Sequence, residues 1–283
     1  MNFQQKPNTF VSHVKLKVQD LNRSIQFYQQ IVGFDILEKT DTTAKLTADG
    51  KTSLLSLEQP EDSLPKQART TGLYHFAILL PTRSNLADFV FHAVNQGIQL
   101  GSSDHLVSEA LYFNDPDGNG IEVYADRDPS TWKWNGDQIA MAVDPLDYED
   151  LVKEGHPNAW RGLPENTVMG HIHLHVAELD KTHDFYTAGL GFDVVSRFGN
   201  QALFISTGKY HHHIGLNTWN GVGAPQPSAN SAGLDYFELT YKDRKSLDQA
   251  FERLKTLGVS VQEESDQAIV TDPAGNKIRL VIQ

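Results

Sequence analysis

The sequence predicts an α+β fold built from repeated βαβββ units. Three observations lead to this prediction: an internal duplication, strand-like alternation followed by helical spacing in each copy, and a turn signal between the last two strands of each copy. With 283 residues, the chain is long enough for about two domains.

The duplication consists of three blocks that recur in the same order. In the first block, nine of 24 aligned positions are identical, including His13 with His171 and Gly33 with Gly191. The third block is the run Asp-Pro-x-Gly-Asn-x-Ile. The paired blocks are 12–35 with 170–193, 72–100 with 233–261, and 115–121 with 272–278. A tandem duplication is the simple explanation for three ordered matches.

The repeats define the predicted domain organisation. The segment between the copies is acidic and has no repeat partner, so we interpret it as a connector. The predicted parts are a first domain at 8–126, a connector at 127–167 and a second domain at 168–283.

Each copy begins with a strand followed by a helix. Residues 13–18 alternate strictly between polar and apolar, which is typical of a strand with one buried face. Asp20 can cap the segment that follows, where apolar residues at 21, 25, 28 and 32 have helical spacing. Gly33 is expected to end that helix, and further strands follow. A second helix is predicted at 84–95, and the whole chain then holds four βαβββ units.

Composition excludes several classes of protein. Acidic residues outnumber basic ones 36 to 24, a net charge of −12, which disfavours nucleic acid and anionic membranes as partners. The chain has no cysteine, so disulfides, thiolate nucleophiles and cysteine-ligated metals are excluded. There is no apolar run of about 20 residues and no apolar signal core near the N-terminus, so we expect a soluble cytoplasmic protein.

The βαβββ units, the Gly-Phe after the first helix and the late Asp-Pro-x-Gly-Asn turn together resemble the vicinal-oxygen-chelate superfamily. This superfamily includes glyoxalases, fosfomycin- and bleomycin-resistance proteins and extradiol ring-cleaving dioxygenases. The runs at 103–112 and 210–219 look like those of the two-domain Bacillus-type catechol 2,3-dioxygenases. The resemblance implies that two units pair their sheets into a half-open cup around a divalent metal. We therefore expect two domains, each an open mixed-sheet cup.

The first repeat offers a set of metal ligands. Because side chains alternate along a strand, His13 faces away from its apolar neighbours and into the expected cup. The resemblance to extradiol dioxygenases places metal ligands on the first, fifth and eighth strands, which here carry His13, His75 and Glu122. Two imidazoles and one carboxylate suit non-haem Fe(II), with Mn(II) as the alternative.

The second repeat keeps only part of this set. His171 matches His13, but Tyr236 stands in place of His75 and Arg279 in place of Glu122. We therefore expect the first repeat to carry the metal. An alternative cluster in the second domain stays open, and its members are His171, His173, His213 and Glu238.

Acid–base partners are implied by the same resemblance, which places a His and a Tyr on the segment before the Asp-Pro-x-Gly turn. His105 and Tyr112 occupy that segment, and Ile269 replaces the tyrosine in the second repeat. The family also carries a further histidine on the strand before the fifth. Residues 52–57 contain none, whereas the second repeat has its histidine run 211–213 at the corresponding place.

The predicted function is extradiol ring cleavage of catechol or a related catechol with O2, as part of aromatic hydrocarbon catabolism. Two alternatives remain: a glyoxalase-like metal-dependent lyase or isomerase, and a non-enzymatic protein of the same fold that binds an aromatic compound or antibiotic. The expected partners are a small aromatic diol and O2, and assembly into a homo-oligomer is left open.

Overall fold

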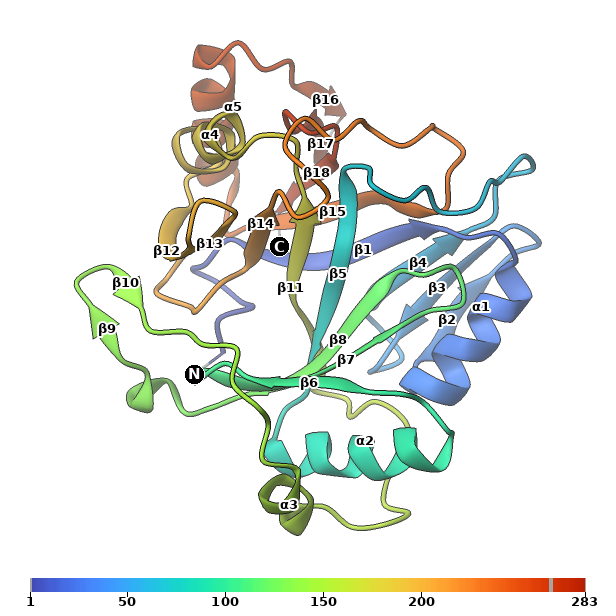
Figure 1. The fold of residues 1–283 in the computed structure, drawn as a ribbon. Helices are drawn as coiled ribbons and strands as arrows, with labels where there is room; N and C mark the ends of the chain where they lie inside the picture. The colour runs from blue at the N-terminus through green and yellow to red at the C-terminus, as the bar shows by residue number, and fades with distance from the viewer. Residues whose placement is uncertain (1, 265–266, 283) are drawn as a thin grey trace.

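Two eight-stranded sheets dominate the computed structural model, which describes residues 2–264 and 267–282 (Figure 1). Few helices accompany them, and the α+β class is confirmed. Among the helices of the described part, none combines the length and apolar character that a membrane span requires.

The first repeat contains two βαβββ units. The first unit comprises β1 (Phe10–Lys17), α1 (Leu21–Phe27), the π-helical turn η1 (Tyr28–Val32), β2 (Asp35–Lys39), β3 (Thr43–Thr47) and β4 (Ser53–Glu58). The second unit comprises β5 (Gly72–Leu79), α2 (Arg83–Asn95), β6 (Gly101–Asp104), β7 (Ser108–Asn114) and β8 (Gly120–Asp126).

The second repeat has the same order of elements. The third unit comprises β11 (Val168–His175), α4 (Leu179–Asp184), the π-helical turn η4 (Phe185–Gly189), β12 (Asp193–Phe198), β13 (Ala202–Ser206) and β14 (Ile214–Asn217). The fourth comprises β15 (Gly233–Tyr241), α5 (Arg244–Thr256), β16 (Gln262–Glu264), β17 (Gln267–Thr271) and β18 (Lys277–Ile282). The segment between the repeats carries η2 (Pro129–Thr131), β9 (Trp134–Asn135), β10 (Gln138–Ile139), α3 (Tyr148–Leu151) and η3 (Val152–Glu154).

Local sequence signals explain the first helix. The Asp20 side chain accepts a hydrogen bond of 2.9 Å from the backbone N–H of Arg23, as an N-cap should. Gly33 ends the helical segment with φ of 94°, a left-handed conformation that favours glycine. Val14 and Leu16 on β1 are fully buried, so the alternating pattern correctly predicts which face of this strand meets the core.

The four units pair across the repeats rather than within them. β1 pairs antiparallel with β15, which joins the first and fourth units; we call this the first-fourth sheet. β5 pairs antiparallel with β11, which joins the second and third units; we call this the second-third sheet. Figure 1 shows β5 and β11 side by side at the centre of the molecule.

This pairing differs from the expectation that each repeat closes its own cup. The first strand of every unit presents a similar edge, and either arrangement gives that edge an antiparallel partner. Local hydrophobic patterns therefore do not choose between the two arrangements. A segment as long as the one between β8 and β11 can connect the repeats in either arrangement, because its length adds only a small entropic cost. As a result, a residue of the first repeat can share a cup with residues of the second.

Candidate metal centre and active site

Three side chains with metal-binding atoms meet on the second-third sheet. In the strand register, His171 of β11 lies opposite Ala77 of β5, and Ala77 lies opposite Glu122 of β8. His75 is two residues before Ala77 and so projects from the same face. The small side chain of Ala77 leaves the space between its two neighbours open. The strand pairing therefore brings one imidazole of the second repeat to an imidazole and a carboxylate of the first.

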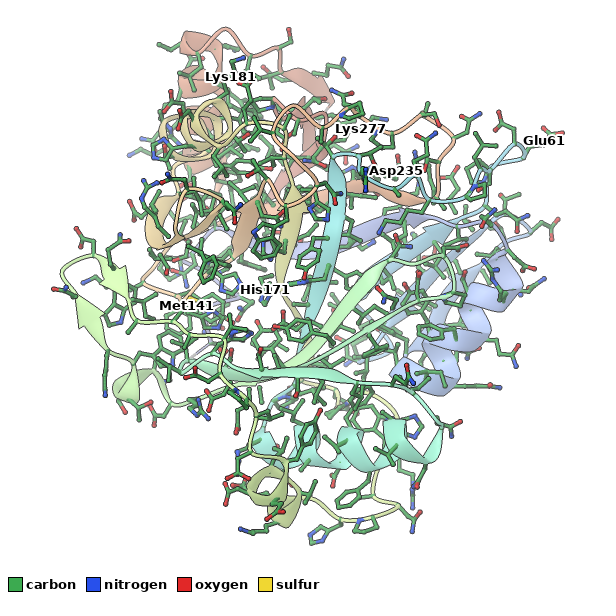
Figure 2. The ribbon with its side chains drawn as sticks, viewed as in Figure 1. Glu61, Met141, His171, Lys181, Asp235 and Lys277 are labelled. Carbon is green, nitrogen blue, oxygen red and sulfur yellow. The ribbon has the colours of Figure 1, made fainter. Side chains whose placement is uncertain are left out.

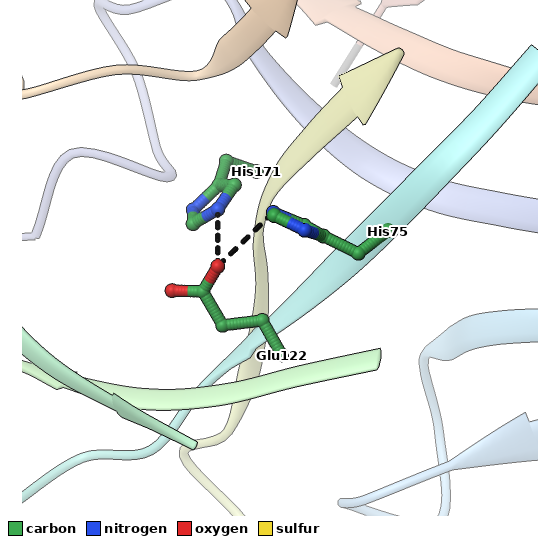
Figure 3. A group of neighbouring side chains, drawn as sticks. All are labelled: His75, Glu122 and His171. Atoms are coloured by element: carbon green, nitrogen blue, oxygen red, sulfur yellow. Dashed lines mark hydrogen bonds and ion pairs between the residues drawn. The ribbon is translucent and has the colours of Figure 1, made fainter. Parts of the chain in front are cut away.

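The three side chains converge on one point (Figure 3). Nε2 of His75 lies 3.0 Å from Oε2 of Glu122, and Nε2 of His171 lies 3.2 Å from the same oxygen. One ligand atom of each residue lies within 4.8 Å of the ligand atoms of the other two. His171 lies in the interior and is 1% exposed, whereas Lys181 and Glu61 lie at the periphery (Figure 2).

Electrostatics favour an ionised Glu122 beside a neutral His171. Burial lowers the pKa of His171 to about 4, so its imidazole is neutral near pH 7. Burial by itself raises the pKa of Glu122, but the contacts with His171 and His75 outweigh it and hold that pKa well below its usual range. A buried carboxylate beside a neutral imidazole is an environment that favours a cation.

The donor set fits a divalent metal of the first transition row. The buried Nε2 of His75 has no hydrogen-bond partner among the described residues, despite its close approach to Glu122. Two imidazoles and one carboxylate converging from three strands form the arrangement that leaves coordination positions open for substrate. A bound divalent ion would satisfy the nitrogen that the protein leaves without a partner.

His13 does not join His75 and Glu122, and the prediction of this ligand set is corrected. It lies on β1 in the first-fourth sheet, where its Nε2 is 2.8 Å from Oγ of Ser56. Because the units pair across the repeats, His171, the matching histidine of the second repeat, lies beside His75 and Glu122 instead.

The corresponding positions of the first-fourth sheet carry different chemistry. In its register, His13 lies opposite Glu238, and Glu238 lies opposite Arg279. Nη1 of Arg279 is 3.2 Å from Oε1 of Glu238, and the guanidinium lies 4.0 Å from the ring centre of Tyr236. An arginine thus takes the position that Glu122 has in the other sheet, and its charge opposes a metal there.

The structure also separates the alternative cluster of the second domain. Glu238 belongs to the first-fourth sheet, whereas His171 and His173 belong to the second-third sheet and His213 directly precedes its strand β14. His173 lies directly opposite His75, but its Nε2 accepts a hydrogen bond of 2.9 Å from the Asn217 amide. His213 is buried, and its Nδ1 accepts a hydrogen bond of 3.3 Å from the backbone N–H of Thr207. Of this set, only His171 lies in the cluster.

Tyr112 and His105 lie together next to the cluster. Tyr112 of β7 is directly opposite Glu122 in the register, and its hydroxyl is 2.6 Å from Nε2 of His105. Nδ1 of His105 is 2.7 Å from the carbonyl oxygen of Ala142, which can only accept a hydrogen bond. Nδ1 therefore carries a proton, and in the neutral ring Nε2 accepts from the Tyr112 hydroxyl. Burial raises the pKa of Tyr112 well above its usual value, so the phenol is protonated near pH 7.

A cavity of about 380 Å³ opens onto this site. His75, Glu122, Tyr112 and His105 all contribute to its wall. Much of the remaining wall is apolar, and its larger apolar side chains are Met141, Val143, Phe198, Phe204 and Trp219. Such a cavity accommodates a small aromatic molecule with polar groups at one end.

Sequence reasoning missed one histidine of the cavity. His212 lines the cavity, is 5% exposed, and stacks on His171 with ring centres 4.1 Å apart. Burial lowers its pKa well below the usual value, so the ring is neutral. The run of three histidines at 211–213 was the signal, but it precedes β14, and strand alternation cannot orient a residue outside a strand. Its position in the cavity wall identifies His212 as a residue of the site.

Comparisons with known proteins agree with the fold. The family model described as "Glyoxalase/Bleomycin resistance protein/Dioxygenase superfamily" matches residues 11–123 and 168–280. The "Catechol-2,3-dioxygenase" of Bacillus subtilis (strain 168) is 46% identical over 279 residues, which cover 97% of this chain and 98% of that protein.

Solved structures share the architecture at low identity. A putative dioxygenase from Bacillus subtilis matches with a TM-score of 0.66 and 13% identity, covering 98% of this chain and 86% of its own. Glyoxalase I from Zea mays matches with a TM-score of 0.58 and 18% identity, and the match covers 97% of this chain and 92% of that protein. At such identities the likeness concerns the fold alone.

Proposed function

The chain belongs to the glyoxalase/bleomycin resistance protein/dioxygenase superfamily, and we propose that it is an extradiol dioxygenase that opens the ring of catechol or a close relative with O2. The observation that carries this proposal is the convergence of His75, Glu122 and His171 beside the Tyr112–His105 pair. The relative from Bacillus subtilis, 46% identical and named a catechol-2,3-dioxygenase, supports the same activity.

The proposed metal ligands are His75, Glu122 and His171, and the proposed metal is Fe(II), with Mn(II) as the alternative. Two histidines and one carboxylate with open coordination positions are typical of non-haem Fe(II) oxygenases. When bound, such an ion would supply the coordination and redox chemistry that ring cleavage of a catechol by O2 requires. All other steps considered below belong to side chains of the protein.

Tyr112 and His105 are proposed to move the proton of a substrate hydroxyl. The Tyr112 hydroxyl donates to Nε2 of His105, so its oxygen can still accept a proton from a hydroxyl in the cavity. As Tyr112 receives that proton, its own proton passes to Nε2 of His105, which becomes the imidazolium. The carbonyl of Ala142 holds the His105 ring through Nδ1 and so fixes the direction of this transfer.

His212 is proposed to serve the opposite side of the site. It precedes β14, two strands from β5 on the side of β11, whereas Tyr112 lies on β7 on the side of β8. A substrate held at the cluster would therefore have a neutral imidazole on one side and a phenol on the other. A catechol has two hydroxyls, and these positions provide one group on each side that can take a hydroxyl proton and later return it.

The apolar wall is proposed to orient the ring and exclude water. Phe204 and Trp219 are aromatic side chains of the cavity, and both contact the ring of His173, at 5.6 and 5.2 Å between ring centres. A flat aromatic ring can pack against such a surface with its two oxygens directed toward the cluster. Dry surroundings also strengthen the charge interactions at the site.

The carboxylate count favours a dioxygenase over a lyase or isomerase. A glyoxalase-like reaction would be expected to use a second carboxylate ligand. Among the described residues that line the cavity, Glu122 is the single carboxylate.

The test starts with protein purified without oxygen and analysed for metal. The metal-free protein is loaded with Fe(II) or Mn(II), and catechol is then added in air-saturated buffer. We expect a yellow ring-fission product and the uptake of one O2 per catechol, both dependent on the added metal. The matched control is Glu122→Gln, which keeps the size of the side chain and removes its charge. If wild-type protein with one metal per chain yields no ring-fission product, the proposed function is wrong.

A further inference from the structure

We infer that Asp126 and His211 are positioning residues that fix the tautomer and the orientation of His212. They lie behind the cavity wall and form a chain of hydrogen bonds that ends on His212. The inference rests on the proposed function for its catalytic consequence, but the tautomer itself can be measured independently of turnover.

The chain of contacts runs from the end of β8 to the cavity. Oδ1 of Asp126 lies 2.8 Å from Nε2 of His211, and Nδ1 of His211 lies 2.8 Å from Nδ1 of His212. His211 is fully buried and His212 is 5% exposed. His212 is the one of these three residues that lines the cavity.

The order of donors and acceptors fixes the protons. A carboxylate only accepts hydrogen bonds, so Nε2 of His211 carries a proton and donates it to Asp126. The ring of His211 lies beside His212 and near His171, with ring centres 4.8 and 6.3 Å away. In a neutral His211 ring with its proton on Nε2, Nδ1 accepts, and the proton between the two rings belongs to Nδ1 of His212.

This assignment defines what His212 offers to the cavity. A neutral imidazole with a proton on Nδ1 has none on Nε2, so Nε2 is an acceptor. His212 can then take a proton from a substrate hydroxyl without first losing one. In the other tautomer Nε2 would be a donor, and His212 could not accept.

Aromatic packing holds the two rings in place. The ring of His211 contacts the rings of Tyr210 and Trp132, with ring centres 4.0 and 5.3 Å away. The ring of His212 contacts the rings of His171 and Phe204, with ring centres 4.1 and 5.1 Å away. Rotation of either ring would require neighbouring side chains to move. The packing therefore sets the orientation of the rings, and the hydrogen bonds set their tautomers.

A second contact anchors the carboxylate end of the chain. The Tyr210 hydroxyl donates to Oδ1 of Asp126 at 3.3 Å and lies 2.7 Å from the hydroxyl of Tyr124. The Tyr124 ring packs against Gly170, where an added Cβ would come within 2.0 Å of the Tyr124 hydroxyl. Gly170 directly precedes His171, so this group packs closely against the strand that carries the proposed ligand.

The direct test is the tautomer of His212 in wild-type protein. Two-bond 1H–15N correlation spectra of 15N-histidine-labelled protein distinguish the two neutral tautomers, in metal-free protein and in protein loaded with diamagnetic Zn(II). The His212 signals are assigned with His212→Gln. We expect the proton on Nδ1. A neutral His212 with its proton on Nε2 would overturn the inference, whatever the activity.

The second test is Asp126→Asn, whose amide has the same shape but can donate to Nε2 of His211. We expect His211 to hold its proton on Nδ1 and His212 to switch to the Nε2–H tautomer. At equal metal content we expect kcat for catechol to fall about 10²-fold or more, with KM nearly unchanged, since a proton-transfer partner is lost. Asp126→Glu should restore the wild-type tautomer and part of the rate, and the exposed Asp137→Asn is the matched control.

The outcomes separate this inference from the proposed function. A tautomer switch in Asp126→Asn with kcat within threefold of wild type would overturn the positioning role. If Asp126→Asn fails to fold, the wild-type spectrum still decides the tautomer. Wild-type protein that holds metal but does not cleave catechol would contradict the proposed function and leave the tautomer measurement valid.

Discussion

Replacing either of two matching histidines should have opposite consequences for metal binding. His171 and His13 occupy the same position in the two repeats, and both are buried. His171 lies 3.2 Å from Glu122, whereas His13 is bonded to Ser56 in the other sheet. We expect His171→Ala to lose the metal and His13→Ala to retain it.

The expected size of the effect follows from the number of ligands. Removing a group that only supports a ligand costs about 10–100-fold in metal affinity, so removing one of three ligands should cost at least 100-fold. At a metal concentration of 100 Kd, binding stabilises the wild-type fold by about 2.7 kcal/mol. A 100-fold weaker site at the same concentration gains about 0.4 kcal/mol. At about 2 °C per kcal/mol, the metal should raise Tm by about 5 °C in wild type and by less than about 1 °C in His171→Ala.

The assay compares thermal unfolding of each protein with and without Mn(II), together with metal content after desalting. His13→Ala serves as the matched control, because it also removes a buried imidazole, from the same strand position of the other repeat. Its metal-free Tm falls through lost packing, but the increment caused by metal should equal that of wild type. A normal increment in His171→Ala, or a lost one in His13→Ala, would refute the ligand assignment.

Three further predictions concern single side chains. Tyr112→Phe should keep the metal and the fold but lower the rate at saturating catechol by about 10²–10⁴-fold, and a change below threefold at equal metal content would remove this hydroxyl from the mechanism. Burial and the nearby Arg279 lower the pKa of His13 to about 3. As the pH falls, His13 therefore takes up a proton in the unfolded chain before it does so in the folded protein. The contribution of the neutral His13 to folding stability is complete above about pH 6.5 and is lost as the pH falls toward 3, with a slope of at most about 1.4 kcal/mol per pH unit. Urea unfolding of metal-free protein between pH 7 and 4 should show a shallower loss in His13→Asn, and an equal loss in both proteins would contradict this. Glu238→Gln should lower the free energy of unfolding by about 1 kcal/mol, since its ion pair with Arg279 is partly exposed, and metal content should stay the same. A loss of metal in that variant would contradict the separation of the two sheets.

Local chemistry made much of the fold predictable. Asp20 and Gly33 bound the first helical segment as their cap propensities indicate, and the helix predicted at 84–95 is found at Arg83–Asn95. The Asp-Pro-x-Gly turns likewise separate paired strands in both repeats. These features depend on residues within one turn or one strand of each other, which a sequence pattern records directly.

The partner of each unit was not predictable in this way. The choice between pairing within a repeat and pairing across repeats depends on contacts between strands more than 90 residues apart in sequence, such as His75 with His173. The two candidate partners of β5 carry the same pattern, with a histidine at the same position of each. Hydrophobic periodicity determines which face of a strand is buried, and it does not determine which strand lies beside it.

The difference between the two sheets was nevertheless present in the sequence. Arg279 and Glu238 replace Glu122 and Ala77 at corresponding register positions, and the two changes compensate each other as an ion pair. A carboxylate that pairs with an adjacent guanidinium cannot also serve a cation, and a guanidinium repels one. The comparison of repeats therefore identified Glu122 as the carboxylate suited to a ligand role, but it could not say which of two identical histidines would reach it. That choice is made by the neighbours each histidine acquires through strand pairing: Glu122 and His75 in the second-third sheet, and an arginine with its counter-ion in the first-fourth sheet.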